Sequence, residues 1–163
     1  MNTRQILNVL DSQLPCTKAR YWNCVPADGL KPELFAKEKL PSCIIFNTQD
    51  SSLPGRHWLA LIGSKRGLIY FDSYGKRLES YGFHGIKAHS RYKDIQGNSN
   101  LCGVYAFLFL LYTIRNGSPA SFYKLFNNDK KKNDEKAARL FNSLQPCSQS
   151  RRRCVHQTCR KRT

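Results

Sequence analysis

Residues 102–114 read Cys-Gly-Val-Tyr-Ala-Phe-Leu-Phe-Leu-Leu-Tyr-Thr-Ile and are apolar on nearly every side of a helical wheel. A helix of that kind lies in a protein core or spans a membrane, and this segment is too short to span one. Asn116-Gly117 follows it and is typical of a left-handed helix C-terminus. The segment predicts a central buried helix on which the rest of the chain packs.

Three strand signals precede this helix, at residues 43–47, 57–63 and 68–72. The short polar link Ser64-Lys65-Arg66-Gly67 joins the second and third, which predicts an antiparallel hairpin. All three segments are almost continuously apolar, so we expect a sheet that is covered on both faces rather than exposed to solvent on one.

The flanking segments are less regular. Residues 3–14 place apolar side chains on one helical face between a capping Asn2 or Thr3 and Pro15, which predicts a short docking helix. Residues 16–41 contain several proline and glycine breakers and predict loop and short helix. A last helix is expected from about residue 133 to 144, with residues 130–132 as an exposed basic turn before it.

The chain is strongly basic, because 27 Lys and Arg against 11 Asp and Glu give a formal charge of +16. This imbalance predicts attraction to polyanions, with nucleic acid as the first candidate. We expect one globular domain at residues 1–146 and a disordered, basic, Cys- and Arg-rich tail at residues 147–163. The predicted contacts to nucleic acid are cations of the tail and of the turn before the last helix: Arg151, Arg152, Arg153, Arg160, Lys161, Arg162, Lys130, Lys131 and Lys132. These residues match no groove-reading motif, so binding to DNA should be non-specific and salt-sensitive.

The tail has two further interpretations. Its arginine clusters are also typical of a nuclear import signal. Cys147, Cys154, His156 and Cys159 are residue types that bind zinc, but their spacing fits no standard zinc motif. No metal site is therefore predicted.

Cys102 is the cysteine whose position suggests chemistry. Seven cysteines without an apolar leader or a membrane-spanning run indicate a reducing compartment, where most thiols are small buried hydrophobes. A thiol in the first turn of a helix, in contrast, lies at the positive end of the helix dipole, which lowers its pKa. The Cys102 backbone N–H can donate to an oxyanion, and Gly103 leaves room for a substrate carbonyl. Gln96, in the flexible loop upstream, can supply a second donor.

His57 and Asp72 complete a catalytic set with Cys102 and Gln96. His57 opens one strand of the predicted hairpin and Asp72 closes the other, so pairing would bring their side chains together at one end of the sheet. Asp72 would orient the imidazole, and His57 would serve the thiol as base. Taken singly, each residue is more often structural, and their joint order carries the prediction. Trp58 points to the opposite face by strand alternation and is assigned to packing.

Five motifs, in this order, resemble the adenovirus protease (adenain) family: Asn47-Thr48, Gly55-Arg56-His57-Trp58, Phe71-Asp72-Ser73-Tyr74-Gly75, Gln96-Gly97-Asn98-Ser99 and Leu101-Cys102-Gly103. The similarity is greatest to adenain-like proteases of Polinton or adintovirus-type elements, and it covers about residues 21–144. The same order of His, Asp, Gln and Cys-Gly marks the wider clan that includes the SUMO-specific proteases.

The resemblance implies an α+β, papain-like or adenain-like cysteine protease fold, in which a mixed sheet packs on a central buried helix that carries the nucleophile. Cys102 is similar in position to the nucleophile, His57 to the general base and acid, Asp72 to the orienting acid and Gln96 to the oxyanion donor. The implied function is a monomeric endopeptidase of the host nucleus and the virion, which matures viral capsid or core precursors after glycine pairs. DNA and a short viral peptide are implied as activators, and no metal, organic cofactor or membrane is implied.

The chain also departs from adenain. Adenain holds its activating peptide by a disulfide to a cysteine in the region that corresponds to residues 73–95. This chain has no cysteine there, which argues against covalent activation by a peptide. The acid is Asp72 where adenain has Glu. Two other functions stay open: an isopeptidase that removes SUMO or ubiquitin, and a non-catalytic, basic nucleic-acid-binding protein on a protease fold.

Overall fold

The computed structural model describes residues 1–144, and the predicted hairpin lies within its mixed sheet. The sheet has five strands in the order β1-β2-β3-β4-β5, with β1 and β5 at its edges. The inner pairs β2·β3 and β3·β4 are antiparallel, whereas β1·β2 and β4·β5 are parallel. The strands span Tyr21–Val25 (β1), Ser42–Asn47 (β2), Trp58–Ser64 (β3), Gly67–Phe71 (β4) and Ala88–His89 (β5).

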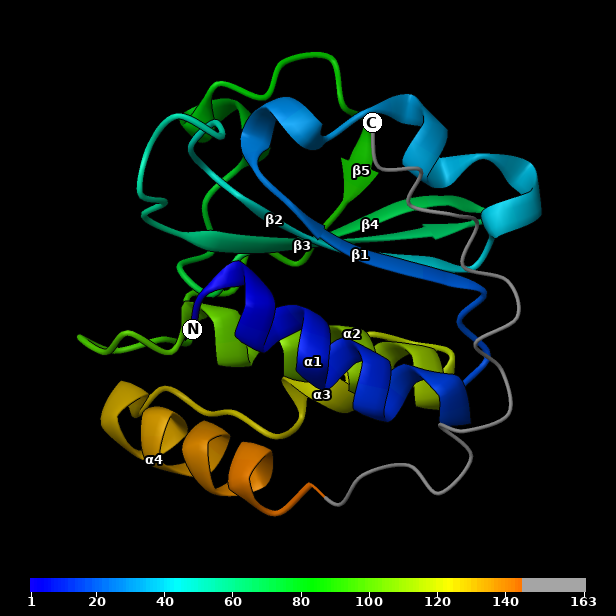
Figure 1. The fold of residues 1–163 in the computed structure, drawn as a ribbon. Coiled ribbons are helices and arrows are strands. Elements are labelled where there is room, and N and C mark those ends of the chain that lie inside the picture. The colour runs from blue at the N-terminus through cyan, green and yellow to red at the C-terminus, as the bar shows by residue number, and fades with distance from the viewer. Residues whose placement is uncertain (145–163) are drawn as a thin grey trace.

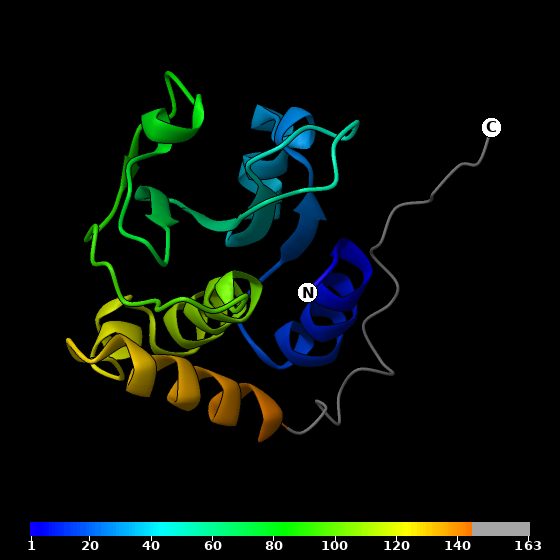
Figure 2. The ribbon, with the colours of Figure 1, turned by 90° about the vertical axis from the view of Figure 1, so that its left-hand side faces the viewer.

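Four α-helices lie on one side of this sheet (Figure 1). Their bounds are Thr3–Gln13 (α1), Cys102–Asn116 (α2), Ala120–Tyr123 (α3) and Lys130–Asn142 (α4). Figure 2 shows α2 and α1 next to the sheet and α4 on the far side of α2. The predicted buried helix is therefore the middle layer, and eleven of its residues, from Gly103 to Ile114, are buried.

Aromatic rings join the buried helix to the sheet. Phe71 of β4 stacks on Phe109 of α2 with ring centroids 4.6 Å apart, and Phe122 of α3 meets both rings edge-on. Such rings bury large apolar areas and dominate the packing energy of a core. On the far side of α2, Phe107 meets Phe141 of α4 edge-on.

The opposite face of the sheet is covered by short 3₁₀ helices and by the long connection after β4. Ile44, Phe46 and Tyr70 point to this side and pack with residues such as Leu34 and Leu78. Because both faces are covered, the strands carry the continuous apolar pattern seen in the sequence. The 3₁₀ helices on this side are η2 (Ala27–Gly29), η3 (Pro32–Phe35), η4 (Lys37–Lys39) and η5 (Leu78–Tyr81), whereas η1 (Leu14–Cys16) continues α1 and packs Leu14 into the core on the helix side.

Most of the expected local structure is confirmed, with three corrections. The segment expected to be loop and short helix contains β1, which pairs in parallel with β2 over its full length. The two-residue strand β5 was also not expected, and it pairs in parallel with β4. The last helix begins at Lys130 rather than near residue 133, because the Asp129 side chain accepts from the Lys132 N–H and caps it. The three lysines therefore form the first turn of α4 and not a separate basic turn.

No helix within residues 1–144 is long and apolar enough to cross a membrane. The predicted tail at residues 147–163 and the domain boundary before it lie outside the described residues, together with the tail cations and the Cys and His residues considered for zinc.

Candidate active site

His57 and Asp72 meet at one end of the sheet. His57 immediately precedes β3 and Asp72 immediately follows β4, so the hairpin brings the two residues together as predicted. The imidazole Nε2 lies 2.6 Å from Asp72 Oδ1. Both residues are buried, with 7% and 2% of their surface exposed, which strengthens their interaction because little water competes for it.

The Asp72 carboxylate is held by the segment that follows it. Oδ1 also accepts the Tyr74 backbone N–H at 3.0 Å, and Oδ2 accepts the Lys76 backbone N–H and the Tyr81 hydroxyl, both at 2.9 Å. Burial raises the pKa of Asp72, but the hydrogen bonds from His57 and the two backbone N–H groups outweigh it and lower the pKa overall. Asp72 is therefore an ionised carboxylate at neutral pH, with four hydrogen-bond partners.

Cys102 is the first residue of α2, and it lies close enough to His57 for the two side chains to shift each other's pKa. Since Nε2 of His57 is engaged by Asp72, Nδ1 is the ring nitrogen left to serve the sulfur. Burial raises the pKa of Cys102, but hydrogen bonds from His57 and from the Trp58 and Gly103 backbone N–H groups outweigh it, and the pKa is lowered. The sulfur thus lies among donors that favour the thiolate.

The charge of His57 complements that thiolate. Burial lowers the pKa of the imidazole, but its hydrogen bonds with Asp72 and Cys102 raise the pKa to about 9. At neutral pH this combination favours an imidazolium beside a thiolate. The buried thiols of the sheet behave in the opposite way, because burial alone raises the pKa of Cys24 to about 12 and that of Cys43 further.

The structure also brings Gln96 into this cluster. Its side chain is 1% exposed, and its orientation is fixed because the Ser73 hydroxyl donates to Oε1 at 2.7 Å. Nε2 donates to Ser99 O at 2.5 Å and contacts the Tyr74 hydroxyl oxygen at 3.3 Å. The Tyr74 ring in turn stacks on His57, with centroids 4.8 Å apart. All four predicted residues therefore belong to one connected site.

Sequence reasoning missed the roles of Ser73, Tyr74 and Tyr81. Tyr74 contacts both His57 and Gln96, and Tyr81 donates to Asp72 while its ring lies 5.6 Å from the imidazole centroid. The available signal was the concentration of hydroxyl-bearing residues just after Asp72. That signal is weak, because Ser and Tyr are also common in ordinary turns.

Helix α4 holds the loop that carries Gln96 from both sides. Before Gln96, the buried Asn133 side chain donates to Ile95 O at 3.0 Å. After it, Asp134 Oδ1 accepts the Gly97 N–H at 3.2 Å and the Tyr105 hydroxyl of α2 at 2.9 Å. A Cβ on Gly97 would lie 2.6 Å from Asp134 Oδ2, so a larger residue there would displace the carboxylate that accepts the Gly97 N–H.

Gly103 has a different role from the one expected. A Cβ at this position would lie 3.2 Å from Trp58 Cδ1 and 3.3 Å from Met1 Cβ, so the space is filled by the protein rather than kept for a substrate. Trp58 packs against the core, as predicted, and its indole N–H donates to Met1 O at 2.9 Å. Gly103 thus allows the start of α2 to pack closely against Trp58.

The lysines at the start of α4 differ in their surroundings. Lys130 Nζ lies 2.5 Å from Asp94 Oδ2, and Lys132 pairs with Asp129 at 3.2 Å. Lys131 is exposed and forms no ion pair within residues 1–144. Over the same residues, no group of three or more His, Cys, Asp or Glu side chains is arranged to hold a metal ion.

No protein-family model matches the chain, and a search of curated proteins also found no match.

Proposed function

We propose that this chain is a cysteine endopeptidase with a papain-like, adenain-like fold. The observation that carries the proposal is the buried His57–Asp72 hydrogen bond, together with Cys102 at the first turn of a buried helix, where His57 lowers the pKa of its thiol. A thiol beside a base that is itself oriented by an acid is the arrangement that acyl transfer by a thiol requires. The order of the motifs, which resembles adenain, supports the same conclusion.

In the proposed reaction, the Cys102 thiolate attacks the carbonyl carbon of the scissile peptide bond. The carbon–sulfur bond forms, and the carbonyl π electrons move to oxygen as an oxyanion. When the intermediate collapses, the C–N bond breaks and the His57 imidazolium gives its proton to the leaving amine. Water then attacks the thioester carbonyl carbon while His57 takes a proton from it. The carbon–sulfur bond breaks and a carboxylic acid is released. Cys102 and His57 return to the thiolate and imidazolium forms.

Two donors would stabilise the oxyanion. The Cys102 backbone N–H is at a helix start, where N–H groups have no intrahelical acceptor. The Gln96 amide is oriented by Ser73 so that its nitrogen faces Ser99 and Tyr74. Because the contact to Tyr74 is long, at 3.3 Å, that N–H is the one that substrate can take over with little loss.

The proposed substrates are structural precursor polypeptides of a virus or virus-like element, cleaved after glycine pairs. This assignment follows from the resemblance, as do stimulation by DNA and a location in the host nucleus and virion. The charge of +16 supports the part that concerns DNA, because such a surface attracts phosphates without base preference. An isopeptidase would use the same four residues, so substrate choice must be measured.

The test is hydrolysis of fluorogenic peptides that contain Gly-Gly, with and without double-stranded DNA. Wild type should cleave them, Cys102→Ala should lose cleavage, and Cys24→Ala should retain it, because the Cys24 thiol is buried in the sheet. Cleavage of SUMO or ubiquitin conjugates but not of these peptides would select the isopeptidase. A thiol-directed probe that labelled Cys102 no faster than Cys24 would favour a non-catalytic protein.

A further inference from the structure

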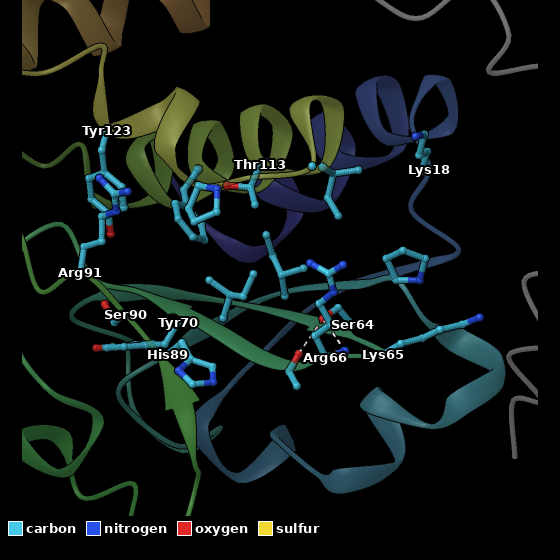
Figure 3. A pocket seen from close by; sticks show the side chains of 18 residues that line it. Lys18, Ser64, Lys65, Arg66, Tyr70, His89, Ser90, Arg91, Thr113 and Tyr123 are labelled. Carbon is cyan, nitrogen blue, oxygen red and sulfur yellow. Dashed lines mark hydrogen bonds between the residues drawn. The ribbon is translucent and has the colours of Figure 1, made fainter.

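A cavity of about 770 Å³ lies between the C-terminal half of α2 and the β3–β4 hairpin (Figure 3). Its apolar walls come from Ile62 and Ile69 of the sheet and from Phe109 and Ile114 of the helix. Cys102 is at the other end of α2, and none of the four predicted catalytic residues lines the cavity. It is therefore a separate site, of a size that accommodates small organic molecules.

The cavity exists because the sheet is incomplete at this edge. β5 has only two residues, Ala88 and His89, and pairs with β4 only at Leu68 and Ile69. Ile69 remains half-buried although it lies in the middle of a strand, whereas its cross-strand neighbour Ile62 is only 2% exposed. The side chain of Ile69 thus leaves apolar surface beside the short strand β5 for another molecule to cover.

The charged side chains around the cavity all have the same sign. Lys18, Lys65, Arg66 and Arg91 line it, together with His89, and no Asp or Glu does. Within residues 1–144, none of these four cations forms an ion pair. Figure 3 shows Arg66 extending from the hairpin turn into the gap between the sheet and α2, and Arg91 at the other side beside Tyr123.

A buried hydroxyl on the cavity wall has no partner. Thr113 is 3% exposed, and its Oγ1 makes no hydrogen bond within the described part of the chain. Figure 3 shows this side chain on the face of α2 that looks toward the sheet. An unsatisfied buried polar group costs about 1–3 kcal/mol, so such groups in native proteins call for a missing partner such as water or a ligand.

We propose that this cavity binds an amphipathic organic anion. The apolar body lies between α2 and the hairpin, against Ile62 and Ile69, and the carboxylate or phosphate head is bound by Arg66. The apolar walls disfavour an ion without an apolar body, and the cationic rim disfavours an uncharged or cationic amphiphile. Residues 145–163 contain no Asp or Glu, so this segment has no acidic side chain to complement the rim.

The experiment is isothermal titration of the full chain with three ten-carbon amphiphiles below their micelle concentrations. Decanoate and decyl phosphate represent the two anionic heads, and decyltrimethylammonium reverses the charge. At least one of the two anions should bind, with a stoichiometry of one site. The cation should bind at least about tenfold more weakly, because repulsion replaces a charge-assisted contact. Whichever anion binds more tightly identifies the head group.

Variants test whether the heat comes from this cavity. Arg66→Gln should weaken anion binding about tenfold, whereas Lys124→Gln, which removes an equal charge from an exposed position outside the cavity, should change it less than about twofold. Ile69→Trp should abolish binding by filling the space. NMR of the wild type provides a check that needs no variant, because the amides of Ile62, Ile69 and Thr113 should shift on titration. Equal binding of the cation, no binding at all, or shifts confined to other residues would overturn the proposal.

Discussion

Asp134→Ala offers a direct test of whether α4 positions the proposed oxyanion donor. Asp134 Oδ1 accepts the Gly97 N–H next to Gln96 and also the Tyr105 hydroxyl of α2. The substitution removes both bonds at once and touches none of the four predicted catalytic residues. Asp134→Asn is the milder change, because it keeps the oxygen and loses only the charge.

The expected losses in stability and in kcat follow from these contacts. A hydrogen bond to a charged group contributes about 1.5–3 kcal/mol, and partial replacement by water should leave a net loss of about 2 kcal/mol in unfolding free energy for Asp134→Ala. A catalytic group misplaced by about 1 Å can cost roughly a hundredfold in rate, and removal of an oxyanion donor costs roughly 10²–10³ in kcat. We therefore expect kcat to fall between about tenfold and a hundredfold, with a smaller fall for Asp134→Asn. KM should change little, because the donor acts mainly on the transition state.

The assay is peptide hydrolysis by a set of variants at one pH, with unfolding followed in parallel. Ala137→Gly is the matched control: it weakens α4 by about 1 kcal/mol or more without touching the Gln96 loop, and its kcat should stay near wild type. The decisive comparison is the double variant of Asp134→Ala with Gln96→Ala. If Asp134 acts through Gln96, the double variant should be no slower than Gln96→Ala alone. Additive losses, or an equal loss in Ala137→Gly, would refute the reasoning.

Four further outcomes are expected. Alkylation of Cys102 by iodoacetamide, followed by mass spectrometry, should remain fast well below the ordinary thiol pKa of about 8.5, because the His57 hydrogen bond lowers its pKa; a rate that rises only near that value would contradict the ion pair. On the alkaline side, kcat/KM should fall as the pH passes about 9, where His57 loses the proton that the leaving amine needs. Tyr81→Phe removes one donor from the Asp72 carboxylate and should lower kcat about three- to tenfold while KM is kept, and an unchanged kcat would show that the hydroxyl is dispensable. Lys131→Gln should weaken DNA binding in a gel-shift titration at low salt and reduce the slope of log affinity against log salt by about 1, whereas an unchanged slope would remove this lysine from the interface.

The stability of the fold should also depend on pH in a direction set by Asp72. Its folded pKa is lowered, so its ionised form contributes stability above the unfolded value of about 3.9, and that contribution is lost as the pH falls through the folded pKa. His57 has the opposite sign: its raised pKa contributes stability that is complete below about 6.5 and is lost as the pH rises through about 9. Thermal melts of Asp72→Asn should therefore depend less on pH in the acid range than those of the wild type, and a wild type whose melting temperature did not fall toward low pH would contradict the ionised pair.

The hairpin and the buried helix could be predicted because their signals are local. A short polar link between two apolar runs predicts the pairing, and the helix that starts at Cys102 is apolar on nearly every side up to Ile114. β1 could not be predicted in the same way. Its partner β2 is about twenty residues away, and parallel pairing depends on a long connection rather than on a turn signal. β5, with two residues, is below the length at which alternation can be recognised.

The site divides along the same line. Four residues could be predicted because their order along the chain resembles that in adenain: His57, Asp72, Gln96 and Cys102. The residues that orient them are recognisable only in three dimensions: Asp134 is 37 residues from the Gly97 N–H that it binds. For Gly103 the sequence predicted the wrong role, namely room for a substrate carbonyl. The neighbours that require a glycine there are Trp58 and Met1, which sequence alone does not place beside it.

The surroundings of Asp72 explain how an Asp, whose side chain is shorter than that of Glu, can hold the imidazole of His57. A Glu in this place would reach the imidazole with an additional rotatable bond, and its position would depend on packing around the longer chain. Asp72 instead belongs to a tight turn that holds both carboxylate oxygens without any contribution from His57. The donors are the backbone N–H groups of Tyr74 and Lys76 and the hydroxyl of Tyr81. The carboxylate is therefore fixed by the connection after β4, while His57 is fixed by the start of β3. Because the two residues are held by different segments, lengthening the acid to Glu should misplace the imidazole even though the charge is conserved. The compact connection from Ser73 to Tyr81 therefore belongs to the proposed catalytic geometry rather than being a spacer.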